Sequence, residues 1–261
     1  MSVAGASEAE RKHQMRILVV NPNTTASMTN TIAAAARAAA AAGTSIEAVT
    51  SAMGPASIEG YYDEALAVPG LLAEIRRGEQ DGADAAIIAC FDDTGLDAAR
   101  AMASIPVIGI CEAALSLASF IARRFSVVTT AELSRVPVED LVLRYGMSAR
   151  ARVRAVGVPV LALEDPLSGA TASLRGEIAL ALEQDRAEAI VLGCAGMADL
   201  AAELQKDFGV PVIDGVGAAV KQAEALVALG LSTGKRGAYA LPAAKRFTGM
   251  LAGFETGKAV A

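Results

Sequence analysis

The 261-residue chain has few aromatic side chains: Trp is absent, and Phe, Tyr and Trp together supply only 4% of the residues. Its hydrophobic content is nevertheless 53%, so its core has to be built from Ala, Val, Ile and Leu. A chain of this length can form one large α/β domain or two smaller lobes. Because small aliphatic side chains suit helices that pack closely on a parallel sheet, we expect an α/β protein.

Histidine is almost absent as well. The single His, His13, lies in the N-terminal stretch 1–15, which we expect to be a disordered tail. A core without imidazole excludes Ser-His-Asp and Cys-His catalysis and His-ligated zinc. Acid–base chemistry in this chain must therefore use Cys, Asp, Glu, Lys or Tyr.

The chain also lacks an excess of Lys and Arg over Asp and Glu, and it lacks long apolar runs. The net charge of −6 argues against nucleic acid as a partner, since phosphate binding needs clustered Lys and Arg. No apolar run approaches the roughly 20 residues that span a bilayer, and the N-terminus lacks the apolar segment of a secretory signal. Three cysteines without such a signal indicate reduced thiols. We therefore expect a cytoplasmic protein that binds neither nucleic acid nor membrane.

Short apolar runs alternate with longer Ala-rich amphipathic segments along the whole chain. The predicted strands are Arg16–Asn21, Ser45–Thr50, Ala85–Ala89, Val107–Ile110, Ser126–Thr130, Arg152–Val156, Ala189–Gly193 and Pro211–Asp214. The predicted helices cover residues 24–42, 63–80, 94–104, 112–123, 134–145, 171–185, 197–208 and 216–229. This alternation indicates doubly wound parallel sheets.

An internal repeat relates the segments Ala86–Ala114 and Ala189–Ala219. Each segment runs through an apolar strand, a cysteine, a helix, a strand that begins at proline, and a helix with an Ala-Ala pair. A duplicated unit of about a hundred residues predicts two pseudo-symmetric lobes. We place them at 16–124 and 125–230. The last helix is expected to cross back to the first lobe, and the stretch 231–261 to be a helix or tail that packs back on that lobe.

The repeat gives Cys90 and Cys194 equivalent positions at the carboxyl end of a strand, where ligand sites of open α/β sheets lie. A pseudo-twofold axis would make them face each other across the interlobe cleft. One thiolate could then remove a proton from one face of a carbon centre, and the other thiol could return a proton to the opposite face. A helix N-terminus lowers a thiol pKa, which starts at about 8.5, whereas Asp92 and Asp93 beside Cys90 would raise it.

The carbanion formed in such a reaction needs hydrogen-bond donors at an adjacent carbonyl. The candidate donors are the backbone amides of Phe91, Asp92, Ala195 and Gly196 and the hydroxyls of Thr129 and Thr130.

The alternative interpretation is structural, because a lone cysteine at a strand end is most often a small buried hydrophobe. That interpretation suits Cys111, which has no counterpart in the second segment. A matched pair in a chain without core histidine favours the functional interpretation for Cys90 and Cys194.

Seven motifs carry a resemblance to a known family. They are Val19–Thr25, Gly54–Ala65, Ala89–Arg100, Pro106–Ala114, Phe125–Thr130, Pro159–Glu164 and Val191–Val216. With them the chain resembles the aspartate/glutamate/hydantoin racemase superfamily, specifically its hydantoin and allantoin racemase branch. The resemblance implies two catalytic cysteines, Cys90 and Cys194, and a homo-oligomer that works without metal or organic cofactor. It further implies that Asn21, Pro22 and Asn23 line the pocket and that Thr129 and Thr130 bind a substrate carbonyl or carboxylate.

The expected reaction is racemisation at C5 of a 5-substituted hydantoin or of allantoin. Related alternatives are an amino-acid racemase acting on aspartate or glutamate, or an enzyme similar to arylmalonate decarboxylase or maleate isomerase. The non-enzymatic alternative is a two-lobed protein that binds a small molecule in its cleft.

Overall fold

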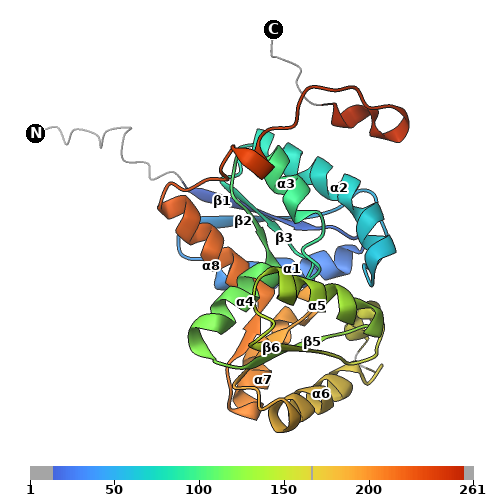
Figure 1. Ribbon diagram of the computed structural model, residues 1–261, viewed down its shortest axis with the longest axis vertical. Helices are drawn as coiled ribbons and strands as arrows, with labels where there is room; N and C mark the ends of the chain where they lie inside the picture. The colour runs from blue at the N-terminus through green and yellow to red at the C-terminus, as the bar shows by residue number, and fades with distance from the viewer. Residues whose placement is uncertain (1–13, 166, 256–261) are drawn as a thin grey trace, which may run out of the picture.

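The computed structural model describes residues 14–165 and 167–255, and it contains two four-stranded parallel sheets of identical strand order (Figure 1). The first sheet has the order β2-β1-β3-β4, with β1 (Met15–Asn21), β2 (Thr44–Thr50), β3 (Ala85–Ile88) and β4 (Val107–Gly109). The second has the order β6-β5-β7-β8, with β5 (Phe125–Thr129), β6 (Ala151–Ala155), β7 (Ala189–Leu192) and β8 (Val212–Asp214). The predicted two-lobed α/β architecture is confirmed.

Helices cover both faces of each sheet. They are α1 (Ala26–Ala39), α2 (Tyr61–Gln80), α3 (Leu96–Met102), α4 (Ile110–Ile121), α5 (Arg135–Arg144), α6 (Ala170–Gln184), α7 (Ala201–Phe208) and α8 (Gly215–Ala228). α2 and α3 pack on the outer face of the first sheet and α6 and α7 on that of the second, while α1, α4, α5 and α8 lie between the sheets (Figure 1). None of the helices in the described ranges is long and apolar enough to cross a membrane.

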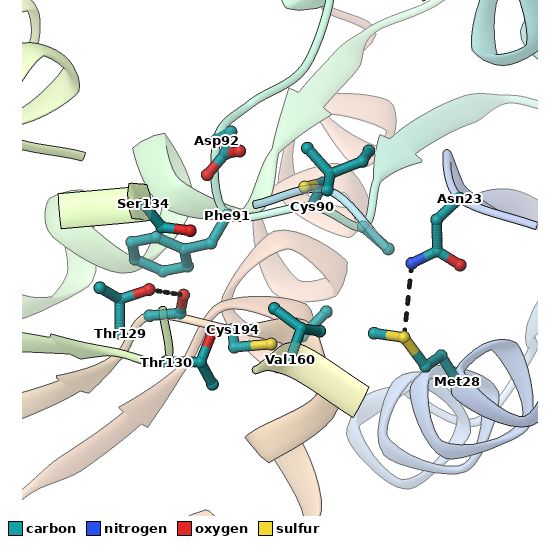
Figure 2. Close-up of a pocket in the computed structure, with 14 residues that line it drawn as sticks. Asn23, Met28, Cys90, Phe91, Asp92, Thr129, Thr130, Ser134, Val160 and Cys194 are labelled. Carbon is teal, nitrogen blue, oxygen red and sulfur yellow. Dashed lines mark hydrogen bonds between the residues drawn. The ribbon is translucent and has the colours of Figure 1, made fainter. Parts of the chain in front are cut away.

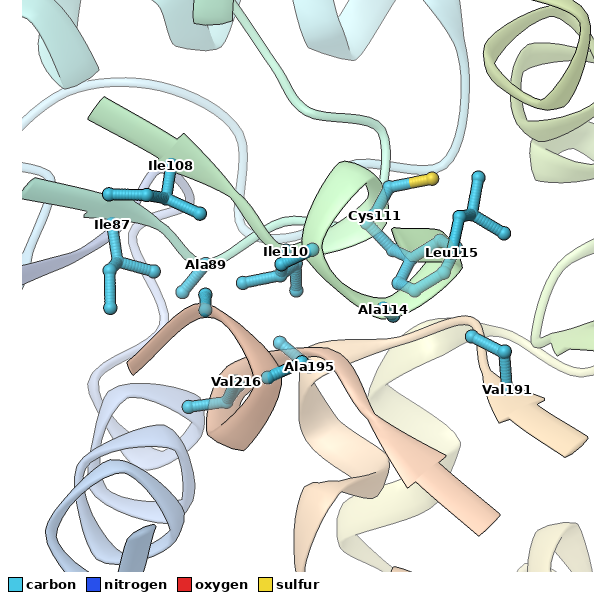
Figure 3. Packing of buried hydrophobic residues seen from close by; sticks show 14 of the residues in the cluster. Ile87, Ala89, Ile108, Ile110, Cys111, Ala114, Leu115, Val191, Ala195 and Val216 are labelled. Atoms are coloured by element: carbon cyan, nitrogen blue, oxygen red, sulfur yellow. The ribbon is translucent and has the colours of Figure 1, made fainter. Parts of the chain in front are cut away.

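The central strands β1, β3, β5 and β7 are buried along most of their length, which explains their continuous apolar sequences. In β1, Ile17 and Val19 join the central cluster between the sheets, whereas Leu18 and Val20 join the outer cluster under α2 and α3. The central cluster is continuous from Ile87 of the first sheet to Val191 of the second (Figure 3). The two lobes therefore share one hydrophobic core, and this fixes their relative position.

Two helices exchange places between the lobes. α4 follows the first sheet but packs against β7, β8 and α8, and α8 follows the second sheet but packs against β1, β3 and β4. The two helices begin in contact, because a Cβ on Gly215 would lie 2.7 Å from the carbonyl oxygen of Ile110. The predicted boundary between 124 and 125 coincides with the start of β5, but α4 already belongs to the shared layer.

The two ends of the chain complete the first lobe. Met15 already belongs to β1, and the rest of the expected tail, residues 1–13, lies outside the described residues. Beyond α8, Thr233 donates a hydrogen bond to the carbonyl of Ile105, and the Tyr239 hydroxyl donates one to Asp97. These contacts tie the described part of the stretch after residue 230 to α3 and the loop that follows it.

Candidate active site

The two cysteines of the repeat lie two residues beyond the ends of β3 and β7. Both strands run parallel to their neighbours, so each thiol lies at the carboxyl edge of its sheet. Cys90 and Cys194 line one pocket, which they border from opposite lobes (Figure 2). These two cysteines and Cys111 are all free thiols. The structure thus brings the predicted pair together, and its catalytic role stays a prediction.

The wall of the pocket comes from both lobes. Its residues are Asn23, Met28, Ile58, Ala89, Cys90, Phe91, Asp92, Thr129, Thr130, Ser134, Val160, Gly193, Cys194 and Ala195. Beside the cysteines, the predicted residues among them are Asn23, Phe91, Thr129, Thr130 and Ala195. The cavity volume is about 30 Å³, so the pocket is narrow.

Three predicted residues lie behind the pocket wall. Asn21 is fully buried and its side-chain amide donates to Asn23 Oδ1 at 2.9 Å, so Asn21 orients the Asn23 side chain. Pro22 is buried between these two residues. Gly196 borders a neighbouring cavity, but its backbone N–H lies against the Cys194 sulfur.

The strand-end threonines serve Cys194 in different ways. The Thr129 hydroxyl donates a hydrogen bond of 3.0 Å to the carbonyl oxygen of Gly193, the residue directly before Cys194 (Figure 2). The Thr130 hydroxyl lies against the Cys194 thiol and favours its ionised form. One threonine therefore fixes the backbone that carries the thiol, and the other acts on the thiol itself.

Three segments that cover the pocket meet at Glu59. They are the segment Gly54–Ala65, which contains Glu59, and the segments around Ser134 and Val160. The carboxylate of Glu59 accepts a hydrogen bond from the backbone N–H of Val160 at 3.1 Å, and its carbonyl accepts one from the Ser134 hydroxyl at 3.2 Å. Ile58, next to Glu59, is 6% exposed and lines the pocket. The segment Gly54–Ala65, one of the motifs that carry the resemblance, therefore supplies part of the pocket wall.

Burial dominates the electrostatics of Cys90. Desolvation raises the pKa of its thiol well above the ordinary value, and the charge of Asp92 raises it further. The backbone N–H of Asp92 and the Thr94 hydroxyl act in the opposite direction. The expected lowering by a helix N-terminus is therefore outweighed. The thiol lies deep in a narrow pocket, and α3 begins only at Leu96, six residues after it.

The pKa of the Cys194 thiol is raised as well, but less far than that of Cys90. Burial raises the pKa of the Cys194 thiol to about 11, and the charges of Asp92 and Glu59 add to the increase. The Gly196 N–H and the Thr130 hydroxyl lower it. Because the 3-10 helix η4 (Ala195–Leu200) starts directly after Cys194, this thiol lies at a helical N-terminus.

Asp92 lines the pocket; its backbone amide was one of the predicted donors, but the sequence identified its side chain only as a charge next to Cys90. Its side chain is 7% exposed, and its Oδ2 atom has no hydrogen-bond partner among the described residues. Burial raises the pKa of this carboxyl to about 7, and the charges of Glu64, Asp93 and Asp63 contribute to the shift. A buried carboxyl without a partner is unusual, since such a group loses its hydration without compensation.

The adjacent Asp93 has a structural task. Its carboxylate accepts the backbone N–H groups of Cys111 and Glu112 at 2.9 Å each, and the Tyr145 hydroxyl donates to it at 2.7 Å. Asp93 thus caps the N-terminus of α4 rather than the helix that follows it in sequence. Cys111 is fully buried, as expected of a structural cysteine, and Glu112 pairs with Arg100 away from the pocket.

Met28, Ile58, Ser134 and Val160 line the pocket without having been predicted. Ile58 and Val160 lie in two of the motifs that carry the resemblance. Their place there indicates that the two segments are important, but it does not indicate which of their side chains face the pocket. Within the ranges 14–165 and 167–255, no group of three or more His, Cys, Asp or Glu side chains could hold a metal ion.

The fold and the site together define a class of protein: a two-lobed α/β protein with a pair of free thiols, one from each lobe, in a narrow interlobe pocket. The chain belongs to the Asp/Glu/Hydantoin racemase family, whose model matches residues 17–223.

Relatives of known name cover almost the whole chain. A hydantoin racemase of Rhizobium meliloti is 54% identical over 236 residues, which are 90% of this chain and 98% of that protein. A hydantoin racemase of Pseudomonas sp. (strain NS671) is 50% identical over 242 residues, 92% of this chain and 97% of that one. The solved structure of allantoin racemase from Klebsiella pneumoniae superposes with a TM-score of 0.90 at 48% identity, covering 93% of this chain and 99% of the other.

Proposed function

We propose that this chain racemises 5-substituted hydantoins or allantoin at C5 of the ring, with Cys90 and Cys194 as the two acid–base groups. The observation that carries the proposal is the pair of thiols in a pocket whose described wall contains no Lys, Arg or His. An α-carboxylate would find no cation on this wall, whereas a neutral ring needs none. The names of the relatives, hydantoin racemase and allantoin racemase, point to the same substrate class.

The reaction uses one thiolate and one thiol. The thiolate removes the C5 proton, and the C5–H electron pair moves into the ring so that the C4 carbonyl becomes an enolate. The thiol on the opposite face gives its proton to C5 as the enolate returns to a carbonyl. The stereocentre is inverted, the two cysteines have exchanged protonation states, and no atom is gained or lost.

The enolate oxygen needs hydrogen-bond donors. The Thr129 hydroxyl is engaged with the Gly193 carbonyl, and the amides of Asp92 and Gly196 lie against the two sulfurs. We therefore assign the donation to the backbone N–H groups of Phe91 and Ala195, which border the pocket on opposite lobes.

A ring substrate is larger than a cavity of about 30 Å³, so the pocket has to open for entry. The hydrogen bonds of Glu59 to Val160 and Ser134 join the covering segments of the two lobes and are the contacts that must break. Closure over the ring then excludes water from the enolate.

Polarimetry tests the proposal. Purified protein with EDTA is mixed with an enantiopure 5-substituted hydantoin, and separately with enantiopure allantoin, and the optical rotation is followed. We expect the rotation of at least one of them to decay to zero. Constant rotation for both would refute the proposal, and decay only with aspartate or glutamate would move the function to an amino-acid racemase.

We further propose that the protein works in the cytoplasm as a homo-oligomer. Free thiols at Cys90 and Cys194 suit a reducing compartment, because a disulfide between them would remove both acid–base groups. Light scattering coupled to gel filtration checks the assembly, and a mass equal to one chain of 26.5 kDa would contradict it.

A further inference from the structure

The carboxyl of Asp92 is a buried polar group of the pocket that has no task in the two-thiol reaction. Its Oδ2 atom is buried and lacks a partner among the described residues, while the whole side chain is only 7% exposed. Figure 2 shows it beside Phe91 on the Cys90 side of the pocket. An acceptor in this state costs stability, and such groups are retained where a ligand supplies the missing donor.

Neither the backbone nor the fold requires a carboxyl at this position. In the second motif the equivalent residue, two positions after Cys194, is Gly196, which has no side chain. Asp93, one residue further, accepts three hydrogen bonds and explains how the same loop is held. The presence of Asp92 therefore points to the ligand rather than to the loop.

The surroundings of Asp92 limit which ligand group can approach it. No Lys, Arg or His belongs to the described wall, and Glu64, Asp93 and Asp63 lie near enough for their charges to act on Asp92. The ionised carboxyl of Asp92 would repel a carboxylate or a carbonyl oxygen there and attract an N–H group. In this form, which predominates above its pKa of about 7, Asp92 therefore selects a ligand group that donates a hydrogen bond.

The position beside Cys90 identifies that donor. In the proposed reaction C5 of the ring lies between the two sulfurs, and its ring neighbours are the C4 carbonyl and the N1–H group. Asp92 lines the same pocket as Cys90, two residues further along the chain, so its carboxyl lies near the reacting carbon. Of the two neighbours of C5, only N1–H can donate.

We propose that Asp92 is a specificity-determining residue whose Oδ2 accepts a hydrogen bond from N1–H of the ring. The pocket then selects cyclic ureides with N–H next to the stereocentre over rings with an acceptor at that place. This inference rests on the proposed function for the orientation of the ring.

The test uses an isosteric pair of ligands. In a 5-substituted oxazolidine-2,4-dione the N1–H of the matching hydantoin is replaced by an oxygen atom, so the donor becomes an acceptor without an added group. We expect the wild-type protein to bind the hydantoin at least about 10-fold more tightly than the dione, measured by calorimetry. The variant Asp92→Asn, whose amide can donate to the ring oxygen, should bring this ratio to about one or invert it.

The matched control is Asp97→Asn, an aspartate on α3 that pairs with Arg144 and Tyr239 outside the pocket. Its binding ratio should equal that of the wild type. Equal hydantoin-to-dione affinity ratios in the wild type and in Asp92→Asn would overturn the proposal. A wild-type ratio near one would also overturn it, and that measurement does not depend on the folding of any variant. Because calorimetry detects binding whether or not the ligand is racemised, a protein that binds hydantoins selectively but never racemises them would refute the proposed function while leaving the role of Asp92 intact.

Discussion

The two cysteine motifs descend from the same unit of the repeat but surround their thiols differently. Cys90 lies in a loop with two aspartates, and α3 begins only at Leu96. Cys194 directly precedes η4, and Gly196 stands where the first motif has Asp92. Burial raises the pKa values of both thiols. The charge of Asp92, which belongs to the Cys90 motif, adds to both increases. The backbone symmetry provides a two-sided site, and the side chains make its two sides unequal.

The largest effect is expected from removing one side of the pair. Cys90→Ser and Cys194→Ser should each lower the racemisation rate about 10³-fold or more, since a serine hydroxyl ionises far less readily than a thiol. Each variant keeps one thiolate, so it should still exchange the C5 proton of one enantiomer in deuterated water. The two variants should exchange opposite enantiomers, as measured by NMR.

Cys111→Ala is the control for these variants, because this third thiol is buried in the core between the sheets and outside the pocket. It should keep the racemisation rate. A serine variant that racemises within tenfold of the wild-type rate would contradict the two-thiol scheme, as would exchange of the same enantiomer by both variants.

The next effect concerns Asp92, the side chain that makes the two motifs unequal. Burial raises its pKa from 3.8 to about 7, so the folded state prefers the protonated carboxyl. That contribution to stability is fully present below about pH 4 and is lost as the pH rises to 7. Asn has no such titration, so the free energy of unfolding of Asp92→Asn relative to wild type should grow by about 2–4 kcal/mol between pH 4 and pH 8.

Urea denaturation at a series of pH values measures this difference. Asp97→Asn serves again as the control, since half of the Asp97 side chain is exposed, and its stability should run parallel to that of the wild type over this range. A difference between Asp92→Asn and wild type that stays constant from pH 4 to pH 8 would mean that Asp92 is not buried as a protonated carboxyl.

The same contrast separates what the sequence could predict from what it could not. The strands could be predicted from local apolar patterns, and the equivalence of Cys90 and Cys194 from an internal repeat. Both signals are present in the sequence alone. Ser134 and Val160 reach the pocket through loops whose path is fixed by hydrogen bonds to Glu59, a residue far away in the sequence. Such contacts leave no periodic signal.

The aspartates and the thiol pKa values illustrate the limit further. Asp92 and Asp93 look alike in sequence, yet Asp93 caps α4 across the fold, whereas Asp92 lines the pocket and its Oδ2 finds no partner within 14–165 and 167–255. The direction of the thiol pKa shifts could not be predicted, because desolvation depends on how tightly the covering segments close.

The smallest effects come from the residue directly before each cysteine, Ala89 in one motif and Gly193 in the other. A Cβ on Gly193 would lie 2.9 Å from Thr129 Cβ and 3.0 Å from Thr129 Cα, so backbone would have to shift. Gly193→Ala should therefore lower the free energy of unfolding by about 1–3 kcal/mol. It should also slow racemisation, because the hydrogen bond from Thr129 to the Gly193 carbonyl holds the segment that carries Cys194.

The reverse change in the first motif provides the matched comparison. Ala89 is 3% exposed, and its backbone N–H donates to the carbonyl of Val20, a bond that Ala89→Gly retains. Loss of one buried methyl group and added freedom of the unfolded chain should cost about 1 kcal/mol with little change in rate. Thermal unfolding and polarimetry of the two variants separate the outcomes. If Gly193→Ala loses stability but turns over as fast as Ala89→Gly, then Thr129 supports the fold of the second lobe and does not position its thiol.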